Sequence, residues 1–230
     1  MAGSFFIAVL LLVVFVFLSL RGAGAPVSVA WFINIFGSHP HARMYREPVL
    51  KLILTGLPFT LELLVSSFIL AAAAAFAITV LALQAPMRLR WIARNLTLPL
   101  RSIPFVWLAA VAALLLAVST RSEMFGASAR PYFDLRDQAA HLFTPSVALA
   151  LFQIPFLTNA RSLPTLIRAF TRALPAILGA TVVIEVFFAW PGDGRLFYEG
   201  LNFGEPSVAT ALLLVGACLV LLMRAVVSDV

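Results

Sequence analysis

Apolar runs alternate with short polar segments along the whole chain, and the lengths of the runs define its organisation. The runs cover residues 2–20, 52–84, 102–119, 144–160, 164–190 and 205–223. An α-helix needs about 20 mostly apolar residues to cross the hydrocarbon core of a bilayer. Lipid offers no partners for backbone polar groups, so such runs are expected to be helical. The sequence therefore predicts an all-α, polytopic membrane protein with about six transmembrane helices.

Composition and charge fit this prediction. With 62% hydrophobic and 11% charged residues, the chain carries more apolar surface than one soluble core can bury. The formal net charge of +6 comes from basic residues in the gaps between the runs, where anionic lipid and the positive-inside rule account for them. We therefore expect the lipid bilayer, and no nucleic acid, as the partner of this charge. The single cysteine, Cys218, excludes a disulfide within the chain.

The N-terminal region is expected to form a separate part. Residues 1–51 would supply the first transmembrane helix and an extracytoplasmic loop, and residues 52–230 hold the other five runs. No basic residue precedes the first run, which favours an uncleaved span over a signal peptide, although residues 22–25 are similar to a cleavage site. His39 and His41 could ligate a metal, but without a third ligand nearby a solvated loop is favoured. The sequence predicts no metal site and no cofactor.

Prolines predict where two of the helices begin. The second run is too long for one perpendicular span, and Pro58 near its start predicts either a kink or a fresh helix start. Residues 120–141 form a polar stretch of mixed charge that is typical of a loop. Thr144 followed by Pro145 is then expected to start the fourth span as N-cap and first helical residue.

The start of the fifth span follows from its length. A helix that began only at Ala176 would reach Ala189 in about 21 Å, too short for a bilayer. We therefore expect this helix to begin near Pro164. Arg168 and Arg172, one turn apart on one face, would then lie at or just inside the membrane boundary. Two interpretations remain open for them, contact with lipid phosphate and a docking contact for a partner protein.

Apart from Glu205, which begins the last run, the carboxylates within the apolar runs are Glu62 and Glu185. An ionisable group at this depth is costly unless it faces protein or water. Glu185 lies five residues before Trp190, where the run ends at a cluster of turn formers, residues 191–194. Trp190 suits a water–lipid boundary, because its ring is apolar while its N–H needs a partner. Glu185 therefore either packs against another helix, lines a path, or reaches up to the interface.

Residues 183–196, VIEVFFAWPGDGRL, resemble the VVETVFSWPGxGRL segment of bacterial ABC importer permeases of the oligopeptide, dipeptide and nickel type. Residues 56–63, GLPFTLEL, resemble the GLPxTLEL segment of the same family, and residues 102–108, SIPFVWL, resemble its SLPSFWL. A weaker resemblance covers residues 143–151. The turn residues that carry the first resemblance are Trp190, Pro191, Gly192, Gly194 and Arg195.

This resemblance implies a permease subunit that forms, with a second permease, a path for peptides or a similar small solute. It implies ATP-binding subunits and an extracytoplasmic substrate-binding protein as further partners. It also implies the bacterial inner membrane as the location, with both termini cytoplasmic. The chain has no HExxH, Walker or glycine-rich phosphate-binding motif, so it is expected not to be an enzyme.

One segment departs from the family pattern. The family carries between its fourth and fifth spans a cytoplasmic loop with a short helix, rich in Glu, Ala and Gly, that docks into the ATPase. Residues 161–175 here contain no acidic residue and no glycine. Arg161, Arg168 and Arg172 remain as ATPase-facing candidates, with coupling in doubt. A degenerate permease paralogue that acts as a scaffold is therefore the alternative, and a membrane enzyme built around Glu62 and Glu185 is less favoured.

Overall fold

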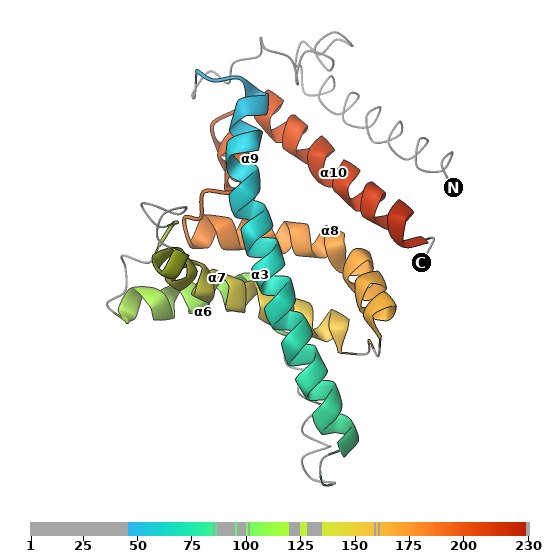
Figure 1. Cartoon of the computed structure of the whole chain (residues 1–230). Coiled ribbons are helices and arrows are strands. Elements are labelled where there is room, and N and C mark those ends of the chain that lie inside the picture. Colours follow the sequence, from blue (N-terminus) through green and yellow to red (C-terminus); the bar gives the residue numbers. More distant parts are fainter. Residues whose placement is uncertain are drawn as a thin grey trace. The chain divides into compact units, whose positions relative to one another are not determined.

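The computed structural model describes residues 46–84, 86, 95, 100, 102–119, 125–127, 135–158, 160 and 162–228. All regular elements in this part of the chain are helices (Figure 1). They are α3 (Val49–Gln84), α6 (Phe105–Val118), α7 (Leu135–Leu157), α8 (Leu163–Phe187), α9 (Asp193–Asn202) and α10 (Pro206–Ser228). The predicted first span, the pair His39 and His41, and Arg161 lie outside the described residues.

Four of the described helices are long and apolar enough to cross a membrane, namely α3, α7, α8 and α10. Helix α6 is apolar but has only 14 residues, which corresponds to about 21 Å. Helix α9 is a short segment of ten residues that follows the turn after α8. The prediction of an all-α, polytopic membrane protein is confirmed.

The described residues form two compact units. In the unit of residues 59–195, α6, α7 and α8 pack against one another around a core to which α3 contributes Leu63 and Leu64. Bulky members of this core from α8 and the turn after it are Ile177, Phe188 and Trp190. Residues 46–58 and 196–228 belong to the other unit, in which Val49 and Ile53 pack with residues of α10. The division of the chain at residues 51 and 52 stays a prediction.

Helix α3 is one continuous helix (Figure 1). Pro58 lies inside it. The predicted fresh helix start at this proline is therefore wrong. Pro58 has no N–H, so the carbonyl of Leu54, one turn earlier, loses its usual helical partner. With 36 residues, or about 54 Å, α3 is longer than the hydrocarbon core is thick.

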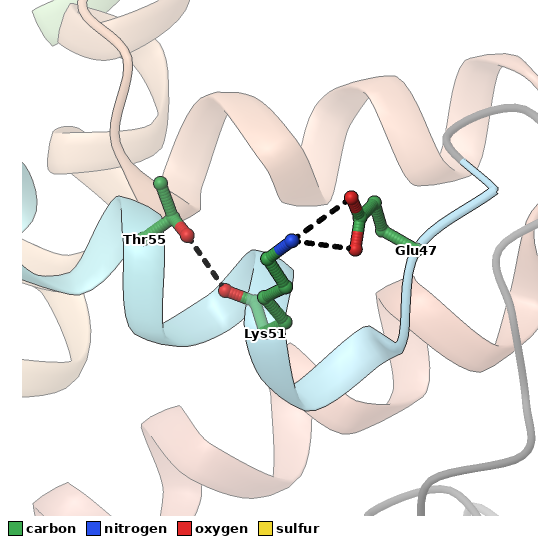
Figure 2. A network of polar contacts seen from close by, with 3 residues as sticks. All are labelled: Glu47, Lys51 and Thr55. Atoms are coloured by element: carbon green, nitrogen blue, oxygen red, sulfur yellow. Dashed lines mark hydrogen bonds and ion pairs between the residues drawn. The ribbon is translucent and has the colours of Figure 1, made fainter.

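One side of the start of α3 carries an exposed polar network (Figure 2). The Lys51 ammonium donates to both carboxylate oxygens of Glu47 at 2.9 Å, and the Thr55 hydroxyl donates to the Lys51 carbonyl at 2.8 Å. Exposed ion pairs at this spacing contribute only a few tenths of a kcal/mol. The network therefore suits a helix end in water and adds little to stability.

Helix α7 begins at Leu135, so the predicted loop up to residue 141 and the predicted start at Thr144 are wrong. The polar residues that suggested a loop have partners inside the protein. Gln138 is buried and donates to Glu62 Oε2 at 2.9 Å. The His141 ring nitrogen Nδ1 lies 3.1 Å from the Gly126 carbonyl. Pro145 consequently lies inside the helix rather than at its first position.

The predicted starts of the last two spans agree with the structure. Helix α8 begins at Leu163, with Ser162 as N-cap, Pro164 in the first turn and a capping box between Ser162 and Thr165. Helix α10 begins at Pro206, directly after Glu205. The start near Pro164, which was predicted from the length that a bilayer requires, is therefore confirmed.

Candidate functional site: the turn after helix α8

The turn after α8 begins with a helix C-cap of the Schellman type. Ala189 adopts a positive φ of 53°, the conformation in which glycine is usual. The Trp190 N–H donates to the Glu185 carbonyl at 2.8 Å, and the Ala189 N–H donates to the Val186 carbonyl at 3.3 Å. The carbonyls of Glu185 and Val186, in the last turn of α8, are thereby satisfied.

The Glu185 carboxylate lies at the centre of this turn and is completely buried. The Thr60 hydroxyl, on α3, donates to Glu185 Oε1 at 2.7 Å. The Arg195 backbone N–H donates to Glu185 Oε2 at 2.9 Å. Each oxygen of the carboxylate therefore accepts a hydrogen bond from a different segment of the chain.

The same carboxylate and hydroxyl cap the start of α9. The first N–H groups of a helix have no partner within it, and the helix dipole favours negative charge at this end. The Asp193 N–H donates to Thr60 Oγ1 at 2.7 Å, while the Arg195 N–H donates to Glu185. Thr60 thus accepts from α9 and donates to α8, which joins three helices through one hydroxyl.

Gly192 and Gly194 allow the chain to approach Glu185 this closely. A Cβ atom at Gly192 would overlap the Glu185 carboxyl group. A Cβ atom at Gly194 would lie 2.8 Å from the Val182 Cα and 3.0 Å from Glu185 Oε2. The spacing of these two glycines is therefore explained by contact with the buried carboxylate.

Trp190 and Arg195 close the turn from its two sides. The Trp190 ring is completely buried, and its Nε1–H donates to the Phe59 carbonyl at 3.0 Å. The Phe59 ring packs edge-on against it at a centroid distance of 6.2 Å. The Arg195 guanidinium donates to the Ala189 carbonyl at 2.8 Å. The sequence predicted Trp190 at the lipid boundary, whereas protein encloses its ring and supplies the partner for its N–H.

Asp193 places a second acid beside this carboxylate. Its side chain is buried, and its Oδ1 has no hydrogen-bond partner among the described residues. Burial raises the pKa of Asp193 from 3.8 to about 7. Asp193 can therefore take up or release a proton near neutral pH.

Glu62 lies in a different environment from Glu185. Its partner is Gln138, part of a polar seam between α3 and α7. The hydroxyls of Ser66 and Ser146 lie 2.7 Å apart in this seam. The Gln153 amide donates to the Ser67 hydroxyl at 2.8 Å, and both residues are buried. The structure therefore gives Glu62 and Glu185 separate partners rather than one shared site.

Arg168 and Arg172 lie at the opposite end of α8 from the turn. They line an open hollow of about 410 Å³ with Phe156, Ala160, Thr165 and Ala169. Both side chains are exposed. The structure therefore places Arg168 and Arg172 on the same exposed hollow, where their side chains are not buried by other residues.

Thr60 and Asp193 belong to this site but were not among the residues that the sequence predicted for it. Thr60 stood inside the GLPFTLEL stretch, but nothing in the sequence linked that stretch to Glu185, 125 positions further on. Asp193 fills the variable position of the WPGxGRL pattern and looked like an ordinary turn former. The position of Asp193 between Gly192 and Gly194 was the one feature of the sequence that could have indicated a role in the site.

Residues 161–228 match the family model described as binding-protein-dependent transport system inner membrane component. No match was found among curated proteins. The matched residues contain α8, the turn around Glu185, α9 and α10, and the family is one of transporter components rather than enzymes. The similarity to this family covers less than half of the chain, and the four apolar helices agree with the membrane location in the family's description.

Proposed function

We propose that this chain is one permease subunit of an ABC importer of the oligopeptide, dipeptide and nickel type. It forms with a second permease the path for peptides or a similar small solute. The match to the transport family supports the broader assignment, and the VIEVFFAWPGDGRL stretch supports the narrower one. The proposed location is the bacterial inner membrane, with both termini on the cytoplasmic side.

The observation that carries the proposal is the hydrogen-bonded turn around Glu185. Two separate stretches that resemble the family, residues 56–63 and residues 183–196, contribute Thr60 and Glu185 to it. Among the residues common to the pattern, Glu185, Trp190 and Arg195 make hydrogen bonds in this turn. Gly192 and Gly194 lie against the Glu185 carboxyl group. A buried network of this kind suits the outer end of a permease helix that must keep its position during transport.

The proposed partners are the second permease, ATP-binding subunits and an extracytoplasmic substrate-binding protein. Coupling to the ATPase is expected to be weak. Helix α7 ends at Leu157 and α8 begins at Leu163, which leaves no room for a separate docking helix between them. A movement of the ATPase can shift a permease only through contacts that differ between its two states. We therefore propose that a fuller partner permease carries most of the coupling.

The short connection also favours a second candidate function, a permease paralogue that stabilises another permease without driving its own cycle. The two functions differ in one measurable respect. A path-forming subunit is required for solute to cross, whereas a scaffold affects only the amount of assembled complex.

The test is reconstitution of the cognate transporter into proteoliposomes with and without this chain. Loss of ATP-dependent peptide uptake per assembled complex when the chain is omitted would support the path-forming subunit. Unchanged uptake per complex, with less complex recovered, would support the scaffold. Unchanged uptake and unchanged recovery would contradict both functions. Strong stimulation of the ATPase by this chain alone would overturn the weak coupling.

A further inference from the structure

The hollow at the N-terminal end of α8 has the character of an anion site. Arg168 and Arg172 lie one turn apart, and both line it. None of its six lining residues is acidic, and neither guanidinium takes part in an ion pair within the described residues. Two cations that share a hollow without a counter-charge favour an anion between them.

The depth of the hollow fits the phosphate level of a bilayer. Arg168 lies nineteen residues before Phe187, the last residue of α8. This separation corresponds to about 28 Å of helix, close to the thickness of a hydrocarbon core. Side chains on a helix lean toward its N-terminus, which here is the nearer membrane boundary. Arg172, one turn deeper, can therefore extend its guanidinium to the same level as Arg168.

The other walls of the hollow fit a lipid better than a free ion. Phe156 contributes an aromatic surface that is 42% exposed, and Ala160 and Ala169 add small apolar side chains. A phosphate with a glycerol and acyl chains attached would contact both the arginines and this apolar wall. Inorganic phosphate would use the arginines alone.

We propose that this hollow, lined by Phe156, Ala160, Thr165, Arg168, Ala169 and Arg172, binds the phosphate headgroup of an anionic phospholipid. The two guanidinium groups hold the phosphate oxygens, and the positive end of the α8 dipole adds to the attraction. Docking of an ATP-binding subunit on the same arginines is the competing use. Lipid is favoured over that use, because the length of α8 puts the hollow at the phosphate level of a bilayer and the chain between α7 and α8 is short.

The test uses the full chain in detergent, titrated with phosphatidylglycerol or phosphatidylcholine and examined by native mass spectrometry. Each arginine near an anionic lipid contributes about fivefold to affinity, so Arg168→Gln with Arg172→Gln should weaken the first phosphatidylglycerol binding event by about thirtyfold. Arg168→Lys with Arg172→Lys, which keeps the charge, should recover part of this loss. Arg224→Gln, which removes a charge from α10, is the matched control and should leave the event unchanged.

The remaining outcomes separate the alternatives. Excess inorganic phosphate should displace little phosphatidylglycerol if the apolar wall contributes. Complete displacement at millimolar phosphate would show a simple anion site and overturn the lipid assignment. Equal binding of phosphatidylglycerol by wild type and the double glutamine variant would also overturn it. So would loss of ATPase co-purification in that variant with its lipid binding unchanged, which would assign the arginines to the partner protein.

Discussion

The two ends of helix α8 differ in how their charged groups are satisfied. At the C-terminal end, the Glu185 carboxylate is buried and accepts hydrogen bonds from α3 and from the start of α9. At the N-terminal end, Arg168 and Arg172 are exposed around an open hollow. The first arrangement fixes one conformation of the chain, because each donor there would lose its partner if the turn opened. At the N-terminal end, the two guanidinium groups form no ion pair within the described residues and can bind an anion outside them.

The largest effect is expected from Glu185→Leu, which breaks the buried end of this comparison. It leaves the Thr60 hydroxyl and the Arg195 N–H without their acceptor, at a cost of about 4 kcal/mol in the free energy of unfolding. Glu185→Gln keeps one acceptor oxygen and should cost about half as much. Thermal unfolding in detergent and the yield of assembled transporter measure both variants. Wild-type behaviour of Glu185→Leu would mean that the carboxylate does not hold the turn.

Gly192→Ala should cost about 3 kcal/mol, because the added methyl group would overlap the Glu185 carboxyl group. Gly179→Ala is the matched control within α8, since nothing lies within 4 Å of a Cβ atom at Gly179. This control should be neutral or slightly stabilising, as expected when alanine replaces glycine inside a helix. Equal melting temperatures for the two variants would contradict the close packing of the turn.

Asp193 should give the turn a pH dependence. Its pKa in the folded protein, about 7, exceeds the ordinary value of 3.8. The folded state therefore binds the proton more tightly, and stability should fall as pH rises from about 4 to 7. Asp193→Asn removes this loss, so the free energy of unfolding of the variant should exceed that of wild type at pH 8, by at most about 4 kcal/mol, but not at pH 4. Unfolding curves at the two pH values measure the difference, and equal gains at both would rule out the titration of Asp193.

The smallest effect on stability is expected at the open end. Arg168→Gln with Arg172→Gln should change the free energy of unfolding in detergent by less than about 0.5 kcal/mol, because both side chains are exposed. Thermal unfolding in detergent measures this variant, and Glu185→Leu in the same experiment is the reference for a large loss of stability. A loss comparable to that of Glu185→Leu would show that the two ends of α8 do not differ as described.

Much of the fold followed from the sequence because bilayer thickness is a strict constraint on helix length. The length that a bilayer requires predicted the start of α8 near Pro164, and in the structure Ser162 is the N-cap of this helix. The early start of α7 could not be predicted in this way. Gln138 and His141 look like loop residues until Glu62 and the Gly126 carbonyl are known to lie beside them.

The sequence pattern predicted which residues form the turn after α8, but not which contacts these residues make. The pattern around Trp190 identified the turn, yet it placed the indole ring at the lipid boundary because an exposed and a buried tryptophan look alike in sequence. Thr60 could not be identified as the partner of Glu185, since a single hydroxyl among apolar residues has many equivalent interpretations. Contacts across 125 positions depend on how the helices pack, which local patterns do not encode.

The hydrogen bond between the Thr60 hydroxyl and the Glu185 carboxylate is the contact that ties the end of α8 to α3 most directly. A double-mutant cycle with Thr60→Val, Glu185→Gln and the combined variant isolates this interaction in the free energy of unfolding. We expect each single variant to cost about 2 kcal/mol and the combined variant to cost less than their sum by about 1 kcal/mol or more. Additive losses within about 0.3 kcal/mol would contradict the claim that α3 holds the end of α8 through this carboxylate.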